Sequence, residues 1–166
     1  MQFEQVFTSA IEAGIAVAGF SGIVAVLGRR AEGQWSPTDR VRVTLLLQTS
    51  FAAIGLSFLA LALDGAGVAD PTIWKVGSTC YALYVVLSVL PRVRLLRTMP
   101  NADPSFPPTV AKGLIVVVLS VAALQAYNAV ALGVGWPFVL AVIFELVVAL
   151  SVFVRLLQGA WSQPAA

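Results

Sequence analysis

Histidine is missing from this chain of 166 residues, cysteine occurs once, and charged side chains make up only 11% of it. Without histidine there is no imidazole to bind zinc, copper or haem iron, and none to act as a general base. The single cysteine, Cys80, excludes an internal disulfide and any multi-cysteine metal site. The sequence therefore predicts no cofactor and no metal site, and it disfavours an enzyme.

The scarcity of charge also indicates the class of protein. Soluble domains carry about 25% charged residues, whereas this chain is 59% hydrophobic. A proline after a capping residue, at Ser36-Pro37 and at Asp70-Pro71, indicates the start of a helix, and Gly133-Val134-Gly135 indicates a tight turn. We therefore expect an all-α membrane bundle that forms a single transmembrane domain of residues 1–166. Its five helices are expected at about 6–28, 37–63, 71–97, 110–132 and 137–157.

The third of these helices is the least apolar. Its uncharged part, residues 76–91, is 16 residues long, whereas about 20 residues span the hydrocarbon core. Lys75 and either Arg92 or Arg94 would extend their charged ends to the interface and make up the difference. The alternative is a helix that lies flat on the membrane. We favour the crossing, because the charges of successive loops alternate between sides only if this helix spans.

The cations predict the orientation of the bundle. With five crossings, Lys75 falls on one side of the membrane and nine cations fall on the other. Those nine are Arg29, Arg30, Arg40, Arg42, Arg92, Arg94, Arg97, Lys112 and Arg155. The positive-inside rule places them in the cytoplasm. We therefore expect the N-terminus outside and the C-terminus inside, in a bacterial cytoplasmic (inner) membrane.

Tryptophans give the same orientation. Trp35 and Trp161 would anchor the chain at the inner interface, and Trp74 and Trp136 at the outer interface.

The first helix carries small residues on two faces. They are Ala10, Gly14, Ala18 and Gly22 on one face, and Thr8, Ala16 and Gly19, together with Glu12, on roughly the opposite one. Small residues let helices approach closely in lipid, so we expect neighbours on both faces. Because a five-helix monomer has little interior, we also expect a homo-oligomer, packed through the face that begins at Ala10.

Polar side chains recur at a similar depth on four helices. At a rise of about 1.5 Å per residue, Glu12 and Glu145 lie roughly 9 and 12 Å below the outer ends of their helices. Tyr81 and Gln125 lie at about 12 and 10 Å. We therefore predict a polar layer, or a small wet cavity, in the outer half of the membrane, built from these four residues and Asn128.

The two glutamates allow two interpretations. No lysine or arginine lies at their depth, so each carboxyl group is expected to keep its proton in the hydrocarbon. Intramembrane acids often belong to ion pathways, which favours a channel or carrier that binds a proton or a monovalent cation. The acids would alternatively hydrogen-bond to Gln125, Asn128 or Tyr81 and only fix helix packing, as in a non-transporting subunit of a membrane complex. We take transport as the main prediction and keep the subunit as the alternative.

Basic residues predict one further contact. Arg92, Arg94 and Arg97 follow the third helix, where they would bind anionic lipid headgroups. The basic loops are short and lack interleaved aromatic residues, so no binding of nucleic acid is expected.

Overall fold

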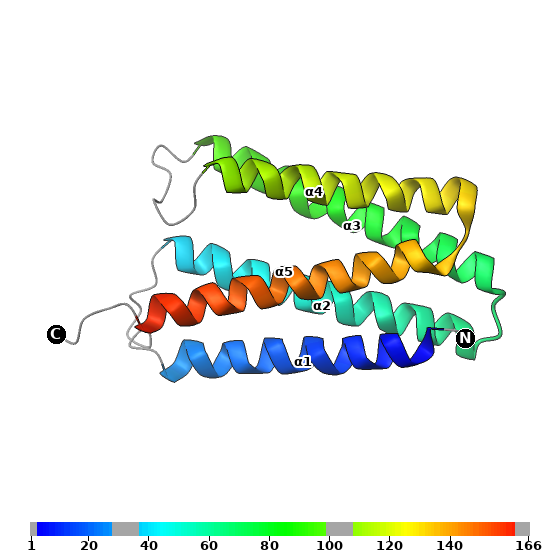
Figure 1. Ribbon diagram of the computed structural model, residues 1–166, viewed down its shortest axis with the longest axis horizontal. Coiled ribbons are helices and arrows are strands. Elements are labelled where there is room, and N and C mark those ends of the chain that lie inside the picture. The colour runs from blue at the N-terminus through cyan, green and yellow to red at the C-terminus, as the bar shows by residue number, and fades with distance from the viewer. Residues whose placement is uncertain (1–2, 28–36, 99–107, 162–166) are drawn as a thin grey trace. The chain divides into compact units, whose positions relative to one another are not determined.

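The computed structural model describes residues 3–27, 37–98 and 108–161, and within these ranges the chain is helical apart from two short turns (Figure 1). The elements are α1 (Glu4–Leu27), α2 (Pro37–Gly65), α3 (Asp70–Thr98), α4 (Pro108–Tyr127), the π-helical segment η2 (Asn128–Leu132) and α5 (Gly135–Trp161). The all-α prediction is confirmed. The five predicted helices are all present, and their ends differ from the expected ones by a few residues.

Four of the helices are long and apolar enough to cross a membrane. The qualifying segments are Glu4–Ile23, Arg40–Gly65, Gly113–Leu132 and Gly135–Gln158. Their length and composition indicate an integral membrane protein. Helix α3 is 29 residues long, but its fully described part is less apolar because it includes Lys75 and several hydroxyl-bearing side chains.

The turn between α2 and α3 follows from local sequence. Gly67 adopts a left-handed conformation with φ of 75°, which glycine reaches without a steric cost. Its N–H donates to the Asp64 carbonyl at 2.8 Å, and the N–H of Val68 donates to the Leu63 carbonyl at 3.0 Å. These bonds satisfy carbonyl groups that the end of α2 leaves open. Helix α3 then begins at Asp70, one residue before the predicted start.

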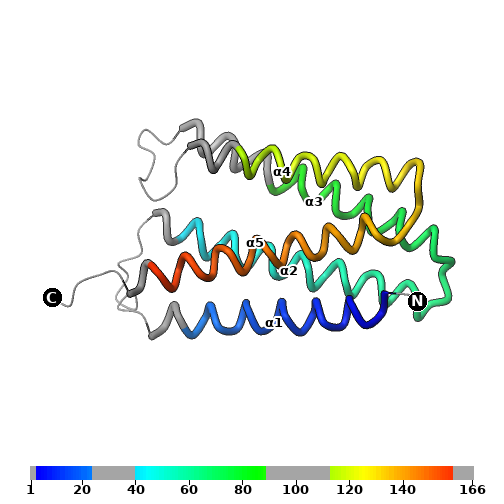
Figure 2. Tube along the Cα trace, in the orientation of Figure 1, coloured from blue at the N-terminus to red at the C-terminus, as the bar shows by residue number. Residues whose placement is uncertain are grey.

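The chain divides into two compact units. We call residues 62–141 the hairpin unit, and residues 2–61 together with 142–166 the terminal unit. Both boundaries fall inside helices, one in α2 and one in α5, as the trace in Figure 2 lets the reader follow. The single domain expected from the sequence stays a prediction.

In the hairpin unit, α3 and α4 run antiparallel and pack side by side (Figures 1 and 2). The start of α5 returns against α3. A Cβ atom on Gly77 would lie 2.8 Å from two ring atoms of Phe138, so only glycine accommodates this approach. Trp74 packs on the same ring, with centroids 6.3 Å apart. Trp74 is therefore buried in protein. Its prediction as an anchor at the membrane interface did not include this contact.

In the terminal unit, α1 and the later part of α5 run in one direction and α2 runs in the other (Figure 1). Gly14 fixes the contact between α1 and α2. A Cβ atom there would lie 2.7 Å from Cγ1 of Ile54 and 3.4 Å from the Ser50 carbonyl oxygen. The buried face of α2 repeats at three- and four-residue spacing, as expected for a helix packed along one side. It includes Leu46, Ser50, Ala53, Ser57 and Ala60.

Candidate functional site

A polar cluster lies inside the hairpin unit. Gln125 and Asn128 are three residues apart, which places their amides on the same side of α4 and its η2 extension. Ser78 of α3 faces both. All three side chains are fully buried. Buried polar groups are costly unless they are hydrogen-bonded, so their partners determine what the cluster can do.

The hydrogen bonds of the cluster form a continuous chain. Asn128 Nδ2 donates to Ser78 Oγ at 2.8 Å, and Ser78 Oγ donates to Gln125 Oε1 at 2.8 Å. Gln125 Nε2 then donates to the Pro137 carbonyl at 2.6 Å. Two amides and one hydroxyl thus join α3, α4 and the first turn of α5.

Asn128 also closes the turn before α5. Gly133 is left-handed, with φ of 63°, and its N–H donates to the Asn128 carbonyl at 2.9 Å. The turn leaves both backbone groups of Val134 outside a helix. The Asn128 side chain satisfies both, because Oδ1 accepts from the Val134 N–H at 3.1 Å and Nδ2 donates to its carbonyl at 3.0 Å. Such π-helical segments often occur where a helix departs from regular geometry for a specific contact.

The polar groups of the cluster therefore hydrogen-bond to one another and to nearby backbone groups. Both N–H groups of the Asn128 amide are donated, and the Ser78 hydroxyl donates once and accepts once. The amide oxygens of Gln125 and Asn128 each accept one bond, from the Ser78 hydroxyl and from the Val134 N–H. The arrangement is that of an interhelical connection, in which polar side chains bond across helices in place of water.

Tyr81 lies one turn after Ser78 on α3. Its side chain is fully buried and its ring centroid is 6.1 Å from that of Tyr84. The sequence selected Tyr81 and missed Ser78, although a three-residue spacing puts both on one side of a helix. That spacing was the signal that would have found Ser78.

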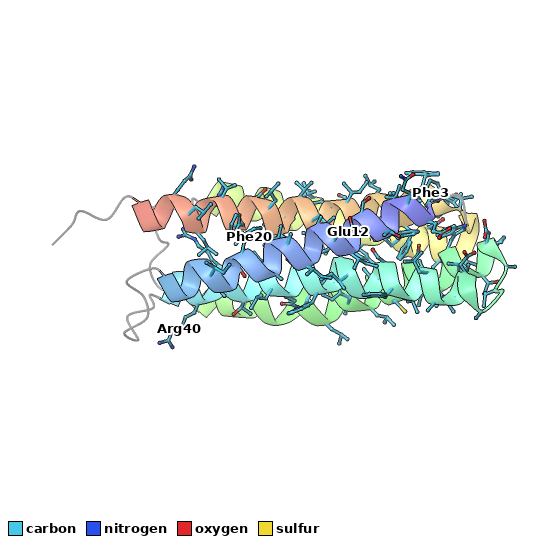
Figure 3. The ribbon with its side chains drawn as sticks, turned by 90° about the horizontal axis from the view of Figure 1, so that it is seen from below. Phe3, Glu12, Phe20 and Arg40 are labelled. Carbon is cyan, nitrogen blue, oxygen red and sulfur yellow. The ribbon has the colours of Figure 1, made fainter. Side chains whose placement is uncertain are left out.

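The two glutamates differ in exposure. Glu145 of α5 is buried, with only 4% of its surface exposed. Glu12 of α1 is exposed, and Figure 3 shows it along the helix between Phe3 and Phe20. Both belong to the terminal unit, whereas Tyr81, Gln125 and Asn128 belong to the hairpin unit. One polar layer shared by all five stays a prediction.

The exposed face of α1 is lined by small residues around Glu12. A Cβ atom added at Gly19 or Gly22 would meet no other atom within 4 Å. Ala16 and Thr8 are exposed as well, and the Thr8 hydroxyl is directed to its own helix, where it donates to the Glu4 carbonyl at 3.1 Å. We call Thr8, Glu12, Ala16 and Gly19 the Glu12 face.

The packing face predicted on the other side of α1 is used within the chain over its first half. Ala10 is buried and Gly14 contacts α2. Ala18 is half-buried, and Gly22 is exposed. Ala10 and Gly14 are thus covered within the chain and could not contact a second copy. Of this face, the end near Gly22 remains exposed.

Two hydroxyl groups of α2 were not singled out from the sequence. Ser50 and Ser57 are fully buried, and their Oγ atoms have no hydrogen-bond partner among the described residues. They are seven residues apart, which places them on one side of the helix. Thr49 differs, because its hydroxyl donates to the Leu45 carbonyl at 2.9 Å.

Other predicted residues lie outside what the structure describes. The side chains of Arg92, Arg94 and Arg97 are among them, so their binding to lipid headgroups stays a prediction. Among the described residues, no group of three or more histidine, cysteine or acidic side chains could hold a metal ion. Comparisons with known protein families, curated proteins and solved structures gave no match for this chain.

Proposed function

We propose that this protein is a structural or interaction subunit of a membrane complex, and that it assembles through the Glu12 face of α1. The observation that carries the proposal is the exposure of Glu12 inside the spanning segment Glu4–Ile23. An ionisable side chain inside a spanning helix is expensive where it faces lipid. Such residues face protein or a water-filled space, and we propose that a second protein surface covers Glu12.

The surroundings of Glu12 suit a second helix. Gly19 leaves open space next to the α1 backbone, and small residues allow the close approach on which helix association in lipid depends. The simplest occupant is a second copy of this chain. Parallel copies bring the two Glu12 side chains to the same depth, and a protonated carboxyl group both donates and accepts a hydrogen bond.

The polar cluster of the hairpin unit favours the function of a subunit over that of a transporter. Gln125 and Asn128 were the amides expected to help bind a cation, and each is engaged by protein groups. In the structure each of these amide oxygens accepts a hydrogen bond from a protein group, which supports a role in fixing the packing of helices.

Transport remains a second candidate, favoured by the burial of Glu145 in the spanning segment Gly135–Gln158. In that case Glu145, and Glu12 at the centre of an oligomer, would bind a proton or a monovalent cation.

We also propose five crossings, with the N-terminus outside, in a bacterial inner membrane. The crossing of α3 is supported by Ser78, whose hydroxyl bonds to Gln125 inside the spanning segment Gly113–Leu132. The orientation rests on the cations of the sequence and the positive-inside rule.

The assembly is tested by measuring mass in nanodiscs for the parent, Glu12→Leu and Glu12→Gln. We expect an oligomer for the parent and monomer for Glu12→Leu, which removes the hydrogen-bonding group. Glu12→Gln should retain part of the oligomer, because an amide still bonds across helices. Glu4→Gln, at an exposed position in the first turn of α1, is the matched control. A monomeric parent would overturn the assembly.

Ion flux into liposomes separates the two functions. The subunit predicts no proton, sodium or potassium flux at any pH between about 5 and 8. A pH-dependent flux that is lost in Glu12→Gln or Glu145→Gln, with both variants folded, would establish transport in its place.

A further inference from the structure

The carboxyl group of Glu12 has no partner among the described residues. Its side chain is exposed within the spanning segment Glu4–Ile23, and no hydrogen bond or ion pair joins it to another described side chain. Figure 3 shows it along α1, between Phe3 and Phe20. Helix α1 carries no basic residue, so its own sequence supplies no counter-ion for Glu12.

The other charges described in the terminal unit do not pair with Glu12. They belong to Glu4, Arg40, Arg42, Glu145 and Arg155. Three of these side chains, those of Arg42, Glu145 and Arg155, interact with other groups. Glu4 lies eight residues before Glu12, about 12 Å along α1.

Helix α2 packs on the side of α1 that is turned away from Glu12. It contacts α1 at Gly14, and two residues of a helix differ in direction by about 200°. At that contact α2 presents Ser50 and Ile54, neither of which titrates. Arg42 precedes Ser50 by eight residues, about 12 Å along α2. Because the rest of the Glu12 face does not titrate either, pH changes the charge of this face through Glu12 alone.

Symmetry brings two such carboxyl groups together. An interface formed by the same surface of two copies is two-fold symmetric, and residues near its axis meet their own equivalents. Copies inserted in the same direction also hold equivalent residues at one depth. The open space at Gly19, two turns further along the same face, lets the two helices come close.

The protons on this pair of carboxyl groups determine whether they attract or repel. Two ionised carboxylates in one site repel each other, and hydrocarbon provides no water to solvate them. With one proton between them, the O–H of one Glu12 donates to a carboxylate oxygen of the other, which is a strong, charge-assisted bond. Removal of that proton breaks the bond and leaves two negative charges face to face.

We propose that a proton held between the Glu12 side chains of two copies controls their assembly, an inference that rests on the assembly proposed above. The dimer then holds at least one proton that two separate, ionised copies do not hold. By linkage, its association constant falls as pH rises. The two copies join at low pH and separate at high pH. This proton stays at the interface, which distinguishes its role from transport.

The test measures energy transfer between full chains that carry donor and acceptor labels at the C-terminus. The chains are diluted in phosphatidylcholine liposomes between about pH 4 and 9, the range in which glutamate side chains of proteins titrate. We expect the dissociation constant to rise with pH, by up to about tenfold per pH unit for each proton released. Glu12→Gln cannot ionise, so its dissociation constant should be the same at every pH.

Glu4→Gln is the matched control, because it removes an exposed carboxyl group of α1 outside the Glu12 face and should keep the pH dependence of the parent. Circular dichroism checks that each variant is folded. A parent dimer of equal affinity at every pH, or a pH dependence that persists in Glu12→Gln, would overturn control by the proton and leave the assembly standing. A parent that is monomeric at every pH and dilution would overturn the assembly, and this inference with it.

Discussion

At the scale of single residues, Asn128 shows how one amide can replace water inside a membrane protein. Its side chain makes three hydrogen bonds, one to Ser78 and two to the backbone of Val134. The Val134 groups belong to a turn that no helix satisfies, and unsatisfied backbone groups cost several kcal/mol in hydrocarbon. The amide therefore stabilises the turn and the contact between helices at once.

Asn128→Ala should lower the free energy of unfolding by about 1–2 kcal/mol, because it leaves the Val134 N–H and the Ser78 hydroxyl without this partner. Unfolding in mixed micelles measures the change. Ser120→Ala is the control, since that hydroxyl donates to the Val116 carbonyl on an exposed side of α4 and should cost little. A loss for Asn128→Ala no larger than that of the control would contradict the role of the amide.

For Ser50 and Ser57 we expect a change in the free energy of unfolding of the opposite sign. A buried hydroxyl without a partner carries a desolvation cost and no compensating bond, so Ser50→Ala and Ser57→Ala should be neutral or should raise stability by up to about 1 kcal/mol. Ser78→Ala, which removes two hydrogen bonds, should be destabilising in the same assay. If the α2 variants lose as much stability as Ser78→Ala, their hydroxyl groups have partners.

At the scale of elements, the approach of α5 to α3 depends on the missing side chain at Gly77. A methyl group there would overlap the ring of Phe138. Overpacking of this kind costs about 1–3 kcal/mol, so Gly77→Ala should lower stability by that amount. The combination with Phe138→Leu should recover part of the loss, which a change in helix propensity alone would not explain.

Gly113→Ala is the matched control for Gly77→Ala. No atom lies within 4 Å of a Cβ at Gly113 in α4, so the change should be neutral or stabilising by up to about 1 kcal/mol through better helix propensity. A similar loss in both variants would show that the contact with Phe138 is not the cause.

The ends of the helices were predictable because their signals are local. Asp70-Pro71 and the glycines at 65, 67 and 133 act on the residues next to them. The candidate site was predictable only in part. Depth along a helix follows from counting residues, and it led to Gln125 and Asn128, which both hydrogen-bond to Ser78 in the structure. It does not say which way a side chain turns, so the exposure of Glu12 did not follow from the sequence.

At the scale of the whole molecule, the chain has two compact units that share two helices. Because the polar cluster lies within the hairpin unit, a change there should act first on that unit. Hydrogen exchange on Asn128→Ala should increase at amides of residues 70–88 and 113–141, and much less at residues 4–23. An equal increase in both ranges would show that the units open together.

The division of the terminal unit between the two ends of the chain has a consequence for biosynthesis. The hairpin unit is continuous in sequence, whereas the terminal unit joins residues 2–61 to residues 142–166. A ribosome releases α1 and α2 first, and these helices then wait in the membrane while residues 62–141 are made. The hairpin unit can close from its own residues in that interval, because contacts close in sequence form fastest. The first helices to enter the bilayer are thus the last to complete their packing. A chain that stops before Val142 would leave α1 and α2 without the later part of α5, the third helix of the terminal unit.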